Sequence, residues 1–116
     1  MEAVIYWLPN CDTCKKAAVF LQQNNVVVTR FHNLKTEKLS RTEIEKLAEM
    51  VGGVENLFSR RAIKYRELGL NKREVLPAEM FDLIESDYTF VKRPVLVIGN
   101  RATCGFSEKN WIEFIK

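Results

Sequence analysis

The feature that most constrains the fold is a pair of cysteines where a predicted strand meets a predicted helix. The apolar run Val4–Leu8 and a Pro9-Asn10 turn precede the four residues Cys11–Cys14. From Cys11 to about Asn24, the composition and apolar spacing are those of an amphipathic helix. A helix N-terminus presents unpaired N–H groups and a partial positive charge, and both favour a thiolate. The sequence therefore predicts that Cys11 is the more acidic thiol.

Cys14 lies one turn after Cys11, on the same side of the predicted helix, where its thiol can attack a sulfur bonded to Cys11. This spacing favours a nucleophile and a resolving thiol. Two alternatives stay open. The pair could be half of a zinc site. The other possible ligands, Cys104 and His32, are far apart in sequence and do not have the spacing of zinc ligands. The pair could also be inert buried thiols.

Length and composition limit the class of protein. A chain of 116 residues forms one domain, 1–116, with a core that needs no disulfide staples. Three cysteines, an odd number, favour a reducing compartment, and no segment has the pattern of a signal peptide or a membrane span. We therefore expect a cytoplasmic protein with no membrane association. A net charge of +3 is too small to indicate nucleic-acid binding.

The first and last thirds of the chain read as strands and helices of an α/β fold. Residues 3–8 are apolar almost throughout, which predicts a central strand buried on both faces, and residues 26–31 are rich in β-branched side chains. With the helix between them they predict a parallel βαβ unit. After Pro94, strands at 95–98 and 102–104 flank a Gly99-Asn100 turn, and Ser107 caps a last helix.

The middle of the chain, about 40–88, reads as a helical insertion. Ser40 and Glu43 form a capping-box pattern for a helix that stops at Gly52-Gly53. A basic stretch, 57–68, is predicted to be helical, and Pro77 begins another helix. This part of the chain contains a basic patch opposed locally only by two glutamates, Glu67 and Glu74. The patch consists of Arg60, Arg61, Lys64, Arg66, Lys72 and Arg73.

The order β-α-β, helices, β-β-α, with a cysteine at the first strand–helix junction, matches a thioredoxin-like fold with a four-stranded mixed sheet flanked by helices. In such folds the proline before the hairpin is cis and lies against the active-site cysteine, which predicts a cis bond at Pro94. The alternative is an ordinary trans proline that opens an edge strand.

Four motifs together resemble the family that joins glutaredoxin-dependent arsenate reductases to the Spx-type regulators of RNA polymerase. The motifs are Cys11–Ala17, Tyr65–Leu70, Lys92–Val95 and Cys104–Glu108, and the resemblance covers nearly the whole chain. The stretch Lys64–Leu70 is more similar to reductase-like relatives than to the regulators.

The resemblance to arsenate reductases implies that Cys11 is the nucleophile and that Arg66 and Arg93, beside Pro94, hold an oxyanion. Guanidinium groups suit this role because each can donate two hydrogen bonds and lower the pKa of a nearby thiol. The alternative for either arginine is a solvated surface charge. The third arginine of that family pattern is replaced by Phe106, which argues against authentic arsenate reduction.

The resemblance to the regulators implies a different use of the same cysteines, in which the Cys11–Cys14 disulfide is a switch. Gly53, Arg60 and Arg61 would then contact the RNA polymerase α subunit. The favoured hypothesis is a thiol oxidoreductase with no bound cofactor or metal. Its electron donor would be glutathione, glutaredoxin or thioredoxin.

The roles of two further residues, Cys104 and His32, remain open. Cys104 is the last residue of the predicted strand 102–104 and is either a small core side chain or a second resolving thiol near Cys11. For His32, which follows the second strand, we expect an ordinary polar residue at a strand end.

Overall fold

The computed structural model describes all 116 residues. It divides into two compact units, which we describe separately. The sheet unit comprises Met1–Glu37 and Arg93–Lys116, and the helical unit comprises Lys38–Lys92. The single domain with an insertion at about 40–88 stays a prediction. No helix is both long and apolar enough to cross a membrane.

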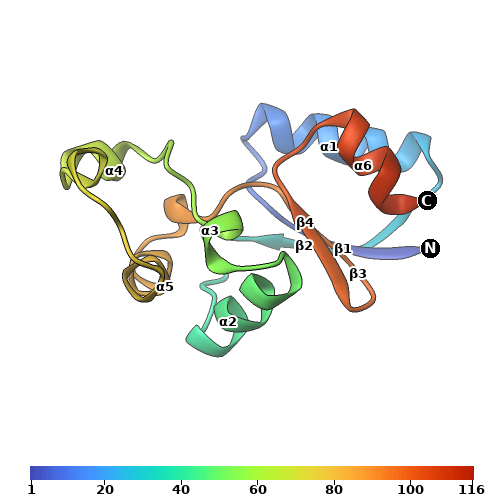
Figure 1. Ribbon diagram of the computed structural model, residues 1–116. Helices are drawn as coiled ribbons and strands as arrows, with labels where there is room; N and C mark the ends of the chain where they lie inside the picture. The colour runs from blue at the N-terminus through green and yellow to red at the C-terminus, as the bar shows by residue number, and fades with distance from the viewer. The chain divides into compact units, whose positions relative to one another are not determined.

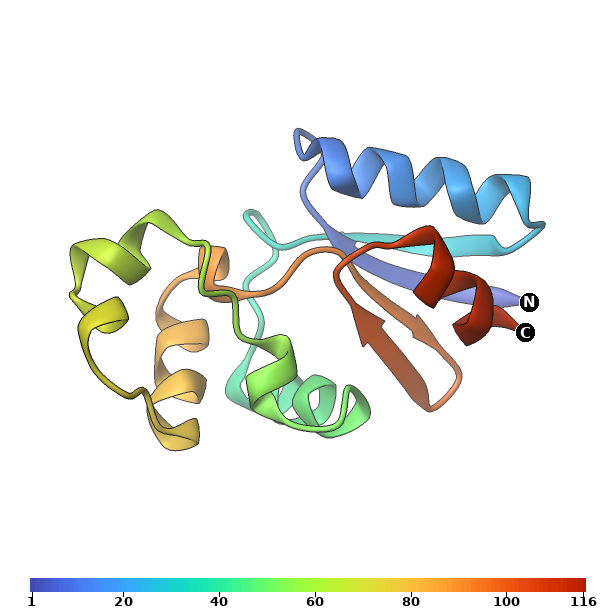
Figure 2. The ribbon, with the colours of Figure 1, turned by 45° about the horizontal axis from the view of Figure 1, so that its top comes forward.

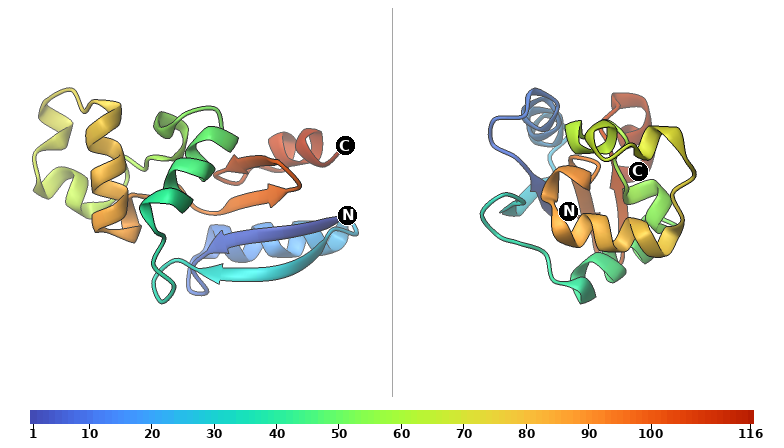
Figure 3. Two further views of the ribbon diagram at one scale, coloured as in Figure 1. Left: turned by 90° about the horizontal axis from the view of Figure 1, so that it is seen from below. Right: turned by 90° about the vertical axis from the view of Figure 1, so that its left-hand side faces the viewer.

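The sheet unit contains four strands in the order β2-β1-β3-β4 (Figure 1). β1 (Glu2–Trp7) is parallel to β2 (Val27–Asn33) and antiparallel to β3 (Val95–Ile98), and β3 forms a hairpin with β4 (Arg101–Cys104). α1 (Asp12–Gln23) connects β1 to β2, which confirms the predicted βαβ unit and the mixed sheet. The left view of Figure 3 shows β2 at one edge of the sheet.

Two strands differ from prediction. β1 is not buried on both faces: Ala3 and Ile5 are buried, whereas the side chains between and after them are only half-buried. β2 continues past Phe31 to Asn33, because the last two residues still pair with Tyr6 and Trp7 of β1. The predicted end at residue 31 was therefore wrong, and His32 belongs to the strand.

α1 and α6 (Glu108–Ile115) pack against the same face of the sheet and enclose its core (Figure 2). Trp111 of α6 is fully buried, and its indole N–H donates a 2.8 Å hydrogen bond to the carbonyl of Gly105. Ser107 caps α6 as predicted, since its Oγ accepts from the N–H of Asn110. The buried residues of this core are Ala3, Ile5, Ala17, Phe20, Leu21, Val26, Leu96 and Trp111.

The helical unit begins with the predicted capping box. The Ser40 Oγ accepts from the N–H of Glu43, and the Glu43 carboxylate accepts from the N–H of Ser40. The elements that follow are short: α2 (Arg41–Met50), α3 (Val54–Leu57), α4 (Ile63–Glu67), η1 (Leu70–Lys72), α5 (Pro77–Ser86) and η2 (Tyr88–Phe90).

The prediction of one basic helix over 57–68 was wrong in part, because after Leu57 only α4 (Ile63–Glu67) is helical in this stretch. α3 ends at Leu57, and Phe58 is extended and pairs in an isolated bridge with Val91. The N–H of Ser59 donates to the carbonyl of Phe90, so the backbone groups that would continue the helix are bonded elsewhere. Tertiary pairing of this segment overrides its local helical composition.

The predicted basic patch is also smaller than its sequence indicates. Lys64 forms an ion pair with Asp87 at 2.7 Å, and Arg73 pairs with Glu79 at 2.6 Å. Both acidic partners lie outside the basic stretch in sequence, which is why counting the local charges missed them.

Candidate functional site

Cys11 is the N-cap of α1. Its φ and ψ of −95° and 118° are extended, and its Sγ accepts a hydrogen bond from the backbone N–H of Cys14 at 3.4 Å. The residue is half-buried, whereas Cys14 is completely buried in the first turn of the helix. A reagent in solvent can therefore reach the Cys11 sulfur but not the Cys14 sulfur.

The surroundings of Cys11 stabilise its thiolate. Partial burial opposes ionisation. The hydrogen bonds from the Cys14 thiol and backbone N–H, together with the positive charge and N–H groups of Arg93, outweigh it and lower the pKa of Cys11 below its ordinary value. The sequence prediction that Cys11 is the more acidic thiol agrees with this direction.

The pKa of Cys14 moves the other way. Burial, followed by the hydrogen bond and charge of Cys11, raises the pKa of Cys14 to about 12. Two of these causes depend on Cys11 being an anion. They disappear once the Cys11 sulfur is covalently bonded, so Cys14 becomes easier to deprotonate at the moment a resolving thiol is needed.

Arg93 and Pro94 belong to the same site. The Arg93–Pro94 peptide bond is cis, which confirms the prediction, and Pro94 is buried immediately before β3. The Nε of Arg93 is buried and has no hydrogen-bond partner in the protein. The sheet unit thus brings together Cys11, Cys14, Arg93 and Pro94.

The other predicted site residues lie in the helical unit. Arg66 is exposed on α4, and Arg60 and Arg61 are exposed in the segment between α3 and α4. None of the three is in an ion pair, and the Arg60 guanidinium lies 5.7 Å from the centre of the Phe58 ring. Gly53 is the N-cap of α3, with φ 136° and ψ 154°, a conformation that only glycine adopts readily.

Cys104 and Phe106 flank Gly105, directly after the hairpin. Cys104 is half-buried in β4, opposite Val95, and the N–H of Gly105 donates to the carbonyl of Pro94 at 2.9 Å. Phe106 packs edge-on against Trp111 and Phe20, with ring centres 5.0 Å and 5.5 Å away. The residue that replaces the third arginine is therefore half-buried and packs against the core.

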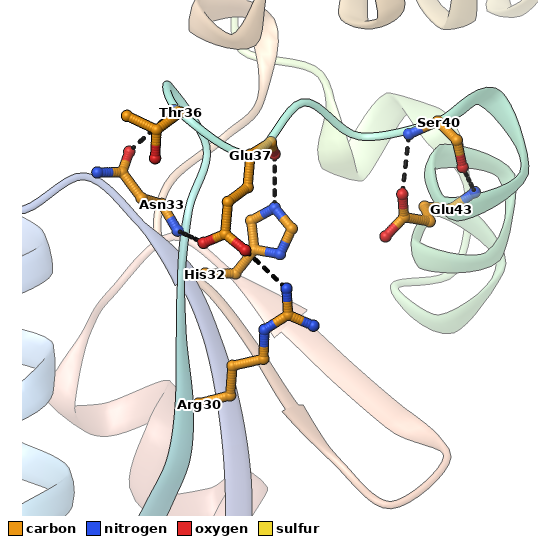
Figure 4. Close-up of polar contacts among 7 residues, drawn as sticks. All are labelled: Arg30, His32, Asn33, Thr36, Glu37, Ser40 and Glu43. Carbon is orange, nitrogen blue, oxygen red and sulfur yellow. Dashed lines mark hydrogen bonds and ion pairs between the residues drawn. The ribbon is translucent and has the colours of Figure 1, made fainter.

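Sequence reasoning missed the role of His32, whose side chain is buried, with only 3% of the residue exposed. Its Nε2 donates to the carbonyl of Glu37 at 2.7 Å, and its ring lies 4.7 Å from that of Tyr6. The Glu37 carboxylate accepts from the Arg30 guanidinium and from the N–H of Asn33 (Figure 4). His32 therefore closes the loop after β2, and the expectation of an ordinary strand-end residue was wrong.

No group of three or more His, Cys, Asp or Glu side chains is placed to hold a metal ion. The chemistry that the arrangement supports on its own is that of thiols, namely nucleophilic attack by one exposed sulfur and exchange with a buried second one.

Comparison with known proteins gives one family. The family model described as "ArsC family" matches residues 6–114. The uncharacterized protein YusI of Bacillus subtilis is 31% identical over 96% of this chain and 99% of its own length. The global transcriptional regulator Spx of Lactiplantibacillus plantarum is 28% identical over 97% of this chain and 85% of its own length.

A solved structure agrees with the fold. The solution structure of an arsenate reductase (ArsC) related protein from Brucella melitensis is similar with a TM-score of 0.77 and 30% identity. The match covers 100% of this chain and 96% of that one. The thioredoxin-like fold class predicted from the order of elements is thereby confirmed.

Proposed function

This chain belongs to the ArsC family, and we propose that it is a thiol–disulfide oxidoreductase in which Cys11 is the nucleophile and Cys14 the resolving thiol. The observation that carries the proposal is the surroundings of the Cys11 sulfur. It is half-exposed, accepts the Cys14 N–H, and faces the positive charge of Arg93, which together lower its pKa. Structural cysteines do not need an activated thiolate.

The reaction begins when the Cys11 thiolate attacks an oxyanion or a substrate disulfide. With a disulfide, the new bond joins the Cys11 sulfur to one substrate sulfur, and the other leaves as a thiolate. Cys14 then attacks the Cys11 sulfur, the second substrate sulfur leaves, and an intramolecular disulfide forms. The substrate gains two electrons and the two cysteines lose them.

Arg93 and Arg66 are the proposed anion-binding residues. Arg93 has a buried Nε–H without a partner in the protein, so it retains a donor for an oxygen placed beside Cys11. Arg66 is assigned to this role by resemblance to the arsenate reductases, and its exposed guanidinium is in no ion pair within the chain. Phe106 cannot supply the third guanidinium of that pattern.

A donor must return two electrons to the Cys11–Cys14 disulfide, and glutathione with glutaredoxin, or thioredoxin, are the proposed donors. The test is an NADPH-coupled turnover assay with each donor system, with and without arsenate. Turnover that is lost in Cys11→Ser supports the proposal. In Cys14→Ser, turnover that is lost with thioredoxin but kept with glutathione would mean that the thioredoxin-dependent cycle requires internal resolution by Cys14. Formation of one Cys11–Cys14 disulfide without catalytic turnover in any donor system would refute the enzymatic function.

A second candidate function is a redox-sensing regulator that binds the RNA polymerase α subunit. The observation in its favour is the likeness to proteins named global transcriptional regulator Spx, which covers 97% of this chain in one case. Gly53, Arg60 and Arg61 are its proposed contact residues. This function predicts a stable complex with the α subunit that weakens in Arg60→Glu and Arg61→Glu, and no catalytic cycle.

A further inference from the structure

One face of α1 leads away from the reactive thiol as a continuous stripe. Lys15, Ala18, Val19 and Gln22 lie four, seven, eight and eleven residues after Cys11, so all five residues share that face of the helix. Cys11 stands at its beginning, Lys15 is exposed one turn on, and Val19 is 51% exposed one turn further. We call these five residues the α1 stripe.

The α1 stripe ends in an apolar groove between α1 and β2. The groove has a volume of about 550 Å³, and it exposes three large apolar side chains: Val19 at 51%, Val27 at 60% and Phe31 at 44%. Figure 2 shows the helix running along the strand. Its lining contains no charged side chain and consists of Ala18, Val19, Gln22, Asn25, Val26, Val27, Val28 and Phe31. Apolar side chains gathered on a surface in this way mark contact sites.

The groove lies within the area that a docked protein covers. At about 1.5 Å rise per residue, Val19 is roughly 12 Å along the helix from Cys11. A protein interface of ordinary size buries about 800 Å² per partner, a disc of roughly 16 Å radius. A protein whose sulfur bonds to Cys11 and which extends along the α1 stripe therefore covers the groove, whereas a small thiol touches only the surroundings of the sulfur.

The charges beside the groove specify the partner. Lys15 and Lys16 are exposed, and neither is in an ion pair within the chain. The one acidic side chain of α1 is Asp12, in the first turn. A partner that fits here has an apolar side chain for the groove and carboxylates for the two lysines.

Addition of a strand to the edge of the sheet fits this surface less well. β2 is an edge strand, but its register with β1 shifts at Thr29, and the exposed Arg30 follows. A bulge and a charge are features that protect an edge against pairing with another strand. The exposed groove beside them therefore favours docking through side chains.

We propose that the α1 stripe and its groove are the docking surface for a dithiol protein that exchanges disulfides with Cys11. This rests on the proposed function and names the partner of that same site. One partner thiolate attacks the Cys11 sulfur of the Cys11–Cys14 disulfide, and Cys14 leaves and takes up a proton. The second partner thiolate then attacks the partner's own sulfur in the mixed disulfide and releases Cys11 as a thiolate. The partner is oxidised to a disulfide and this protein gains two electrons.

The test compares protein and small-molecule reductants on the oxidised protein. The reductants are thioredoxin, glutaredoxin and dithiothreitol, and the readout is the rate of appearance of the two thiols. The docking variants are Val19→Glu and the double variant Lys15→Glu/Lys16→Glu. The matched control is Ile112→Glu, because Ile112 is an apolar side chain on α6 of the same unit with 39% exposure.

We expect each docking variant to lower kcat/KM with the protein reductants at least tenfold and to leave the rate with dithiothreitol within twofold of wild type. The control Ile112→Glu should have the wild-type rate with every reductant. Equal rates for all variants with the protein reductants overturn the docking surface and leave the proposed function standing. A wild-type disulfide that dithiothreitol reduces but neither protein reduces also overturns the docking surface. A change from dimer to monomer in Val19→Glu, seen by light scattering, assigns the groove to a second copy instead. Absence of any Cys11–Cys14 disulfide refutes the proposed function itself.

Discussion

The backbone N–H of Cys14 donates to the Sγ of Cys11 at 3.4 Å, so the helix that carries the buried thiol also stabilises the exposed thiolate. The same two residues have opposite pKa changes, and each contributes to the change in the other. One sulfur is therefore held ready to attack, and the other stays protonated until the first has reacted.

The first prediction concerns the pH dependence of alkylation. Because the pKa of Cys11 is lowered, its thiolate forms as the pH rises through a value below that of an ordinary cysteine, whereas Cys14 stays protonated up to about pH 12. We expect iodoacetamide to modify Cys11 well before Cys14 in the native reduced protein at neutral pH. Peptide mass spectrometry after timed alkylation at a series of pH values measures both residues. Earlier modification of Cys14 would contradict the assignment.

The second prediction concerns the source of the lowered pKa. Arg93→Gln removes a positive charge near the Cys11 sulfur, so the pKa of Cys11 should rise and alkylation at neutral pH should slow by roughly tenfold. Arg93→Lys should keep part of the effect because the charge remains. The control is Arg101→Gln in the same unit, since the Arg101 guanidinium bonds to the carbonyl of Phe114. An unchanged alkylation profile in Arg93→Gln would remove Arg93 from the site.

Local patterns predicted much of the fold correctly. The Ser40–Glu43 capping box, the Gly99-Asn100 turn, the Ser107 cap and the cysteine at the start of α1 are signals contained within a few residues. At Cys11, Ser40, Glu43 and Ser107 a side chain bonds to backbone nearby in sequence, and the turn joins two adjacent strands, which is why composition and spacing were sufficient.

The features that sequence reasoning missed depend on partners distant in the chain. Phe58 is not helical because it pairs with Val91, and the positive charge of Lys64 is compensated by an ion pair with Asp87. Likewise, the strand pattern of residues 26–31 did not reveal that Val27 and Phe31 are exposed, at 60% and 44%, in the strand at the edge of the sheet. Which strand lies at an edge is decided by the pairing of all the strands, and one segment cannot reveal it.

The third prediction separates a structural from a binding role for Gly53. Its φ of 136° is strained for any other residue, and a Cβ there would lie 2.8 Å from a Glu55 carboxylate oxygen. Gly53→Ala should therefore lower the free energy of unfolding by about 1–3 kcal/mol. Gly69→Ala is the matched control, because Gly69 has φ 71° and open space around it. Its cost should be about 1 kcal/mol.

Urea unfolding followed by circular dichroism measures both glycine variants. If Gly53→Ala is as stable as the wild type, the backbone at this position relaxes without cost, and any effect of the substitution on partner binding is then a direct one. A larger loss for Gly69→Ala than for Gly53→Ala would contradict the conformational argument.

The fourth prediction asks whether arginine at position 106 restores an anion site. Phe106 packs against Phe20 and Trp111, and aromatic pairs of this kind each contribute about 0.5–1.5 kcal/mol. Phe106→Arg should lose both contacts and lower the free energy of unfolding by about 1–3 kcal/mol, without increasing arsenate-dependent turnover. Phe106→Leu is the control, since it keeps an apolar side chain and should cost less. Arsenate turnover that rises in Phe106→Arg, with stability equal to that of Phe106→Leu, would show that the side chain turns out of the core toward Cys11. The replacement of the third arginine would then be the reason why the wild-type chain handles a different substrate.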